Sequence, residues 1–197
     1  VGREWAVGAG MYGAGLVIDL GDGSDSYLGD FLTEGVGGPH GLGAIVDQGG
    51  NAIDTADVYS AWVPGHQGGE SETVLGRWLK ADGKRAKVVV ATKVGMWPKR
   101  LGIKRDNIIA ACEDSLQRLG IEKIDLYWLH RDDEATAAEE YVAALDELVK
   151  SGKVRTVGAS NFKASRLAEG LTESAKSGKV RFKAPNGRHL KSNKTGG

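Results

Sequence analysis

The sequence predicts an incomplete α/β protein of the (β/α)8 barrel type, with about five to six strand–helix units. Short apolar runs alternate with amphipathic helical patterns, and this order indicates parallel strands because a helix fills the crossover between them. The apolar runs lack a polar–apolar alternation, which is typical of strands buried on both faces. Four runs end in side chains able to transfer a proton or bind a ligand. In a (β/α) barrel the strand ends meet on one face, so we expect these side chains to share a pocket.

Four apolar runs are predicted to be the strands that carry this pocket. They span residues 51–53, 87–92, 124–129 and 154–158, and they lead into the segment 54–59, Lys93, His130, and the pair Ser160 and Asn161. The first segment contains Asp54 and Tyr59. The sequence therefore predicts that an aspartate, a tyrosine, a lysine and a histidine meet at one face of the barrel.

Three amphipathic helices are predicted between and after these strands. Apolar residues recur at helical spacing over residues 70–80, 106–119 and 139–150. The single cysteine, Cys112, lies on the apolar side of the second pattern, which favours a small core residue over a nucleophile. It also excludes an internal disulfide and a cysteine metal cluster, and it fits a reducing compartment.

The two ends of the chain differ in composition from its middle. Residues 1–50 are rich in glycine, and only one or two short strands between Val7 and Ile18 are predicted there. The last residues, 171–197, are rich in lysine, glycine and serine. We therefore expect a partial barrel domain over residues 1–170, followed by a poorly ordered tail.

The composition is that of an ordinary globular protein. The chain has 197 residues, of which 41% are hydrophobic, and its formal net charge is zero, so no overall charge favours nucleic acid or an anionic membrane. No run approaches the roughly 20 apolar residues of a membrane span, and the first residues lack a secretory pattern. The histidines, His40, His66, His130 and His189, lack metal-ligand spacing. We expect a cytoplasmic protein without a metal site.

Five motifs lie in order between residues 51 and 169. They are Asp54-Thr55-Ala56-Asp57-Val58-Tyr59, Gly69-Glu70-Ser71-Glu72, Ala91-Thr92-Lys93, the stretch from Ser115-Leu116-x-Arg118 to His130, and Gly158-Ala159-Ser160-Asn161. Together they resemble the aldo-keto reductase family. This resemblance implies an eight-stranded TIM barrel, an NADP(H) cofactor and a small-molecule carbonyl substrate. NADP rather than NAD is the family's usual cofactor.

Carbonyl reduction by hydride transfer leaves negative charge on the carbonyl oxygen, so the site needs a proton donor and a positive charge. Tyr59 is the predicted general acid, and Lys93 would supply an ammonium group that favours the ionised phenol. Asp54 would keep Lys93 charged, and His130 would orient the carbonyl oxygen. By resemblance, Ser160 and Asn161 would hold the nicotinamide carboxamide, with Asp54 also beside the cofactor.

The resemblance ends before the segments that the family uses to hold the rest of its cofactor. We therefore expect strands six to eight to be missing, and the sequence shows no Gln-x-x-Tyr-Asn segment, Ser-Pro-Leu turn or Arg/Lys cluster for the adenosine phosphate. A catalytically inactive relative therefore remains the alternative, as a binding or regulatory module or a fragment that does not fold alone. Association with a second copy could cover the exposed barrel edges. Trp62 and Trp97 are candidate walls of the substrate pocket.

A nucleotide-binding enzyme of another class is not favoured. Gly8-x-Gly10-x-x-Gly13, Val90-Ala91-Thr92-Lys93 and His130-Arg131-Asp132 each echo a protein-kinase motif. A kinase needs an asparagine five residues after that aspartate, where this chain has Ala137, and it needs an Asp-Phe-Gly motif that the sequence lacks. The same glycines precede a strand-like run rather than a helix, which excludes the usual dinucleotide-binding turn.

Overall fold

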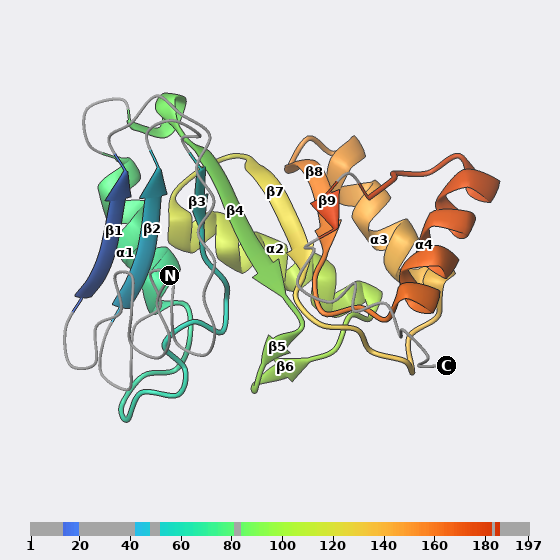
Figure 1. The fold of residues 1–197 in the computed structure, drawn as a ribbon, viewed down its shortest axis with the longest axis horizontal. Helices are drawn as coiled ribbons and strands as arrows, with labels where there is room; N and C mark the ends of the chain where they lie inside the picture. Colours follow the sequence, from blue (N-terminus) through green and yellow to red (C-terminus); the bar gives the residue numbers. More distant parts are fainter. Residues whose placement is uncertain (1–13, 20–41, 48–51, 81–83, 183, 186–197) are drawn as a thin grey trace, which may run out of the picture.

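The fold is known from a computed structural model, which describes residues 14–19, 42–47, 52–80, 84–182 and 184–185. Its main sheet is parallel and contains, in spatial order, β3 (Ala52–Asp54), β4 (Val89–Val94), β7 (Ile124–Leu129), β8 (Val154–Ala159) and β9 (Ala184–Pro185). A parallel pair, β1 (Ala14–Asp19) and β2 (Leu42–Asp47), lies next to β3 (Figure 1). The alternation of parallel strands and helices confirms the α/β, barrel-type prediction, and the described strands make up an incomplete barrel.

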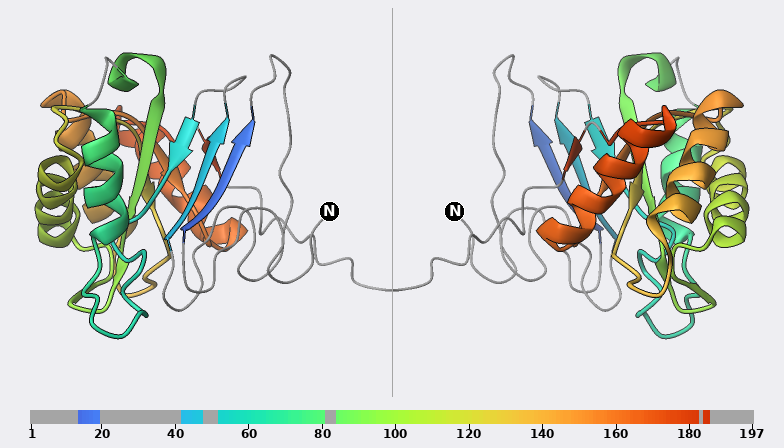
Figure 2. Two further views of the ribbon diagram at one scale, coloured as in Figure 1. Left: turned by 90° about the vertical axis from the view of Figure 1, so that its left-hand side faces the viewer. Right: turned by 90° about the vertical axis from the view of Figure 1, so that its right-hand side faces the viewer.

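Helices fill the crossovers between these strands. They are α1 (Glu70–Leu79), α2 (Arg105–Leu119), α3 (Ala138–Lys150) and α4 (Ala164–Ser177). Neighbouring helices contact one another in sequence order, and the first three lie together on one side of the sheet (Figure 2). A short 3-10 helix, η1 (Lys84–Lys87), precedes β4, and the hairpin of β5 (Met96–Trp97) and β6 (Arg100–Leu101) follows it. The three helices predicted from periodicity are confirmed.

The hydrophobic core lies between the strands and the helices. Buried members include Val90, Val94, Ile108, Cys112, Leu116, Tyr127, Leu129, Tyr141, Leu145 and Val157. Because side chains alternate along a strand, the immediate neighbours of these core residues face the other side of the sheet. Thr92 bonds a residue of α1, so its neighbour Lys93 points away from the helices. Cys112 is part of the core as predicted, and burial raises the pKa of its thiol to about 12.

Helices α1 and α2 approach each other at Gly76, and the absence of a side chain there is required. A Cβ atom at Gly76 would collide with the backbone oxygen of Arg118 and lie 2.8 Å from that of Leu119. This close approach brings the buried face of α1 against the last turn of α2. It therefore also positions Glu72, on the same face of α1, next to Arg118.

The segment after residue 170 differs from the prediction of a poorly ordered tail. Helix α4 continues to Ser177, and Phe182 is 6% exposed, with its ring centroid 6.3 Å from that of Tyr141. The amide of Val180 also donates to Asp146 Oδ1 at 3.0 Å. Lys176, in the last turn of α4, is exposed, and Phe182 beyond the helix completes the packing. Residues 183 and 186–197 lie outside the described part of the chain.

The N-terminal strands also differ in part from the prediction. Strand β1 overlaps the stretch from Val7 to Ile18 for which the sequence predicts one or two strands, whereas β2 lies in a glycine-containing stretch for which it predicts none. The Gly8–Gly13 motif, His40 and His189 lie outside the described residues. In the parts of the chain that the structure describes, no helix has both the length and the apolar character needed to cross a membrane.

Candidate active site

The residues predicted to share a pocket lie at the carboxyl ends of neighbouring parallel strands. Asp54 ends β3, Lys93 is the penultimate residue of β4, and His130 directly follows β7. Backbone hydrogen bonds continue the strand pairing past these ends, from Thr55 N to Ala91 O at 2.9 Å and from His130 N to Val94 O at 2.9 Å. The register of the sheet therefore fixes the positions of these three side chains relative to one another along the strand direction.

Lys93 is the centre of this site. Its ammonium group donates to the Asp54 carboxylate, to the Thr55 backbone oxygen at 2.9 Å and to the Tyr59 hydroxyl at 2.8 Å. The Lys93 side chain is 5% exposed, whereas that of Asp54 is 50% exposed. Burial lowers the pKa of Lys93, but Asp54 and then Tyr59 outweigh this effect and raise the pKa above its ordinary value of 10.5. Lys93 is therefore a buried cation with all three donors used.

Tyr59 is held by aromatic contacts in addition to this hydrogen bond. Its ring meets Trp62 edge to face at 6.2 Å between centroids and His130 at 5.9 Å. Lys93 Nζ also lies 4.6 Å from the centroid of the Tyr59 ring. These contacts leave the phenol oxygen next to an ammonium group and near an imidazole, which is an arrangement suited to proton transfer.

His130 is held as a neutral imidazole. It is 9% exposed, and its Nδ1 has no hydrogen-bond partner among the described residues. Burial, and then the positive charge of Lys93, lowers the pKa of His130 from 6.5 to about 3. A neutral imidazole can still donate one hydrogen bond, so His130 could orient a carbonyl oxygen without adding charge.

The pH dependence of folding should report this state of His130. Because its folded-state pKa is depressed, stability should fall as the pH drops below about 6.5, where the imidazole of the unfolded chain takes up a proton that the folded chain does not. The expected contribution is about 1.4 kcal/mol for each pH unit. It can be measured by urea unfolding of the wild type and of His130→Gln between pH 6.5 and pH 4.5. Equal pH slopes for the two proteins would show that His130 ionises normally.

Ser160 and Asn161 directly follow β8, beside the end of β7. The side-chain nitrogen Nδ2 of Asn161 donates to His130 O at 2.8 Å and to Ser160 Oγ at 3.1 Å. Asn161 has a positive φ of 55°, which asparagine tolerates better than most residues. The structure thus brings Ser160 and Asn161 next to His130, at the same end of the parallel strands as Lys93.

The two tryptophans predicted to line the substrate pocket lie in different places. Trp62 is 46% exposed and stands against Tyr59. Trp97 instead donates from Nε1 to Gln67 O at 2.6 Å, and the guanidinium groups of Arg100 and Arg118 lie 5.2 and 5.9 Å from its ring centroid. Trp97 therefore joins the β5–β6 hairpin to the segment before α1, and among the described residues its hydrogen bonds and ring contacts do not reach Tyr59 or Lys93.

A buried polar network lies behind the site, and sequence analysis assigned it no role. Glu72 is fully buried in α1, where it accepts from Thr92 Oγ1 at 2.6 Å and from Arg118 Nε at 2.7 Å. Thr92 is the neighbour of Lys93 in β4, so this network holds the strand that carries the lysine. The sequence does carry a signal for the burial of Glu72. It precedes Leu75 by three residues and Leu79 by seven, which places it on the apolar side of α1.

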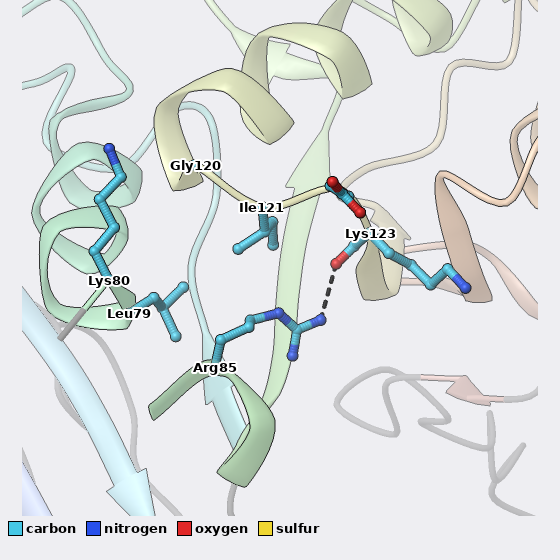
Figure 3. A pocket seen from close by; sticks show the side chains of 7 residues that line it. Leu79, Lys80, Arg85, Gly120, Ile121 and Lys123 are labelled. Atoms are coloured by element: carbon cyan, nitrogen blue, oxygen red, sulfur yellow. Dashed lines mark hydrogen bonds between the residues drawn. The ribbon is translucent and has the colours of Figure 1, made fainter. Parts of the chain in front are cut away.

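A separate pocket lies at the opposite ends of the strands (Figure 3). It is lined by Leu79, Lys80, Arg85, Gly120, Ile121, Glu122 and Lys123. Lys80 and Gly120 follow the C-termini of α1 and α2, where the helix dipole favours positive side chains. Arg85 is bonded to the oxygen of Lys123 at 2.9 Å and paired with Asp125 at 2.7 Å. The basic residues here are explained by the fold.

Comparisons with known proteins agree with this geometry. The model of the aldo/keto reductase family matches residues 41–184. Aldo-keto reductase str7 of Strobilurus tenacellus is 38% identical over 135 residues, which are 66% of this chain and 40% of that protein. Aldo-keto reductase yakc [NADP(+)] of Schizosaccharomyces pombe is 35% identical over 58% of this chain and 33% of its own length. The human aflatoxin B1 aldehyde reductase member 4 is 35% identical, over 64% and 36%. The chain spans about two fifths or less of these relatives.

Proposed function

The chain belongs to the aldo/keto reductase family, and from this premise we propose that it takes part in the NADP(H)-dependent reduction of an aldehyde or ketone to an alcohol. The observation that carries the proposal is the contact of the Lys93 ammonium with both Asp54 and Tyr59. NADP is proposed as the cofactor because it is the family's usual one and because a relative carries it in its name. A small aldehyde or ketone is proposed as the substrate class, since a relative is named as an aldehyde reductase.

The residues at the ends of β7 and β8 fit the nicotinamide end of such a cofactor. Ser160 and Asn161 are polar side chains able to hydrogen-bond a carboxamide, and the half-exposed Asp54 lies at the end of β3, paired with Lys93. His130 Nδ1 has no partner within the described residues. When bound, the reduced nicotinamide would supply the hydride, that is, a proton with two electrons, to the carbonyl carbon.

The chain's own residues would manage the proton and the charge. Tyr59 would donate its hydroxyl proton to the carbonyl oxygen as negative charge develops there, which completes the alcohol. Lys93 would stabilise the phenolate that remains, because its ammonium already donates to that oxygen. Asp54 would keep the lysine charged, and the neutral His130 would hydrogen-bond the carbonyl oxygen and fix its orientation.

The proposal is tested by titrating the purified 197-residue chain with NADPH and then adding a simple aldehyde. Tryptophan quenching and nicotinamide fluorescence measure binding, and the aldehyde-dependent loss of nicotinamide fluorescence measures turnover. Saturable binding with turnover is the expected result. A folded chain that binds no NADPH would support the alternative of a catalytically inactive family member. Sedimentation of the same sample tests the further prediction that two copies associate through the sheet edges.

A further inference from the structure

Asp57 is a buried carboxyl group that the proposed reaction does not use. It lies two residues before Tyr59, it is 2% exposed, and its Oδ1 has no hydrogen-bond partner among the described residues. Its backbone amide donates to Lys93 O at 3.3 Å. The backbone of Asp57 thus ties the segment 55–59 to the strand of Lys93, while its side chain points into a region without a hydrogen-bonding partner for Oδ1.

The charged groups around Asp57 each form an ion pair with a residue other than Asp57. They are Glu72 from α1, Arg118 from α2 and Arg100 from β6, and the fully buried Tyr127 hydroxyl from β7 is the other titratable group near it. Arg118 is bonded to Glu72, and Arg100 is paired with Asp114. Both guanidinium groups are therefore already paired with another carboxylate, and neither is hydrogen-bonded to Asp57, although Arg100 Nε has no partner among the described residues.

This environment favours the protonated form of Asp57. Burial, and then the negative charge of Glu72, raises its pKa from 3.8 to about 7, although Arg118, a hydrogen bond from the Val58 backbone and Arg100 oppose the change. A buried carboxyl group without a hydrogen-bonded cation is expected to be neutral, since ionising it would leave an unpaired charge in the interior.

We propose that Asp57 is a positioning residue for Tyr59: its protonated carboxyl lets the segment 55–59 stay closed on Lys93, and its ionisation opens that segment and weakens the contact between Tyr59 and Lys93. The effect of this opening on catalysis rests on the proposed function. The opening itself does not, because it depends only on the burial of Asp57 and on the hydrogen bond between its amide and Lys93.

Proton linkage gives the expected size of the effect. The carboxyl group would have an ordinary pKa of 3.8 when the segment is open and a pKa of about 7 when it is closed. The closed state therefore binds the extra proton, and closing becomes less favourable as the pH rises between these values. The equilibrium constant for opening should increase about tenfold for each pH unit in this range and become constant above it.

The test is amide hydrogen exchange of the 197-residue chain, followed by NMR as a function of pH. Between pH 5 and pH 7, the exchange rate of the Asp57 backbone amide should rise by a factor of about ten per pH unit in addition to the increase due to base catalysis. Asp57→Asn, a neutral variant of the same shape, should show base catalysis alone. The amide of Leu167, which donates to Lys163 O at the start of α4, reports openings that leave Asp57 buried.

Two outcomes would overturn the inference: no additional factor in the wild type, or the same factor in Asp57→Asn. If that variant does not fold, Arg100→Gln gives a second test. Removing this positive charge should raise the pKa of Asp57, so the additional factor should extend to higher pH, and an unchanged profile would contradict the inference.

The pH profile of turnover separates this inference from the proposed function. In an active chain, kcat should fall as the pH rises towards 7, because the open form increases in that range, and it should be constant above it; this fall should be absent in Asp57→Asn. A rate that falls equally in both proteins would argue against a positioning role. A chain that shows the exchange behaviour but no turnover would overturn the proposed reductase activity and leave the opening of the segment established.

Discussion

Replacing Tyr59 by phenylalanine is expected to lower kcat for aldehyde reduction by about 10²- to 10⁴-fold, the usual contribution of a general acid. The variant keeps the ring that packs against Trp62 and His130, and it removes only the hydroxyl that accepts from Lys93 at 2.8 Å. NADPH binding should remain, since the phenol would act on the substrate oxygen. Steady-state kinetics with a simple aldehyde, together with an NADPH titration of both proteins, measure the two effects.

Tyr141→Phe is a matched control for this change. Its hydroxyl is 3.4 Å from Arg166 O, between α3 and α4, and it lies outside the proposed site. We expect this variant to keep the wild-type kcat. A Tyr59→Phe protein that reduces the aldehyde as fast as Tyr141→Phe would rule out Tyr59 as the general acid and would require another proton donor near Lys93.

Replacing Arg118 by methionine should lower the free energy of unfolding by about 3–5 kcal/mol. Glu72, whose side chain is 0% exposed, would lose the guanidinium nitrogen at 2.7 Å that pairs with it. A buried carboxylate without its cation costs more than the pair contributes, because the pair's own attraction is largely offset by desolvation. Urea unfolding followed by far-UV circular dichroism measures the loss.

Two further proteins separate the cost of an unpaired charge from that of a smaller side chain. The double variant Glu72→Gln with Arg118→Met removes both charges and should recover part of the lost stability. Arg105→Met breaks an ion pair with Glu147 in which both side chains are about half exposed, and it should change stability little. If the double variant were no more stable than Arg118→Met, the loss would come from packing of the Arg118 side chain.

The helices and the main strands could be predicted because their patterns are local. In α3, Tyr141, Leu145 and Leu148 recur at helical spacing, and all three are buried as that spacing requires. The short apolar runs that became β4, β7 and β8 needed no long-range information either. The proximity of Asp54, Lys93 and His130 follows from the parallel arrangement alone, since parallel strands end on one face.

The parts that were missed depend on contacts between distant residues. Glu72 and Arg118 are 46 positions apart, and a glutamate in an amphipathic helix is usually solvated, so its burial becomes visible only in the folded structure. Phe182 lies in the lysine-rich segment that the sequence predicts to be poorly ordered, but it packs on Tyr141 of α3, a residue distant in the sequence. The contact of Trp97 with Gln67 through the β5–β6 hairpin is likewise invisible in the sequence, and the substrate-pocket role of Trp97 stays a prediction.

The alternation of side chains along β4 has a consequence for mutational screens of this protein. Lys93 faces the proposed chemistry, while its neighbour Thr92 holds Glu72 on the opposite face of the strand. A library scored by enzyme activity alone would rank both positions as equally intolerant, and Glu72 would join them without touching any reactant. Measuring the amount of folded protein for each variant in parallel would separate the two faces of β4. Only substitutions on the face that meets α1, at Thr92 and Glu72, should lower that amount.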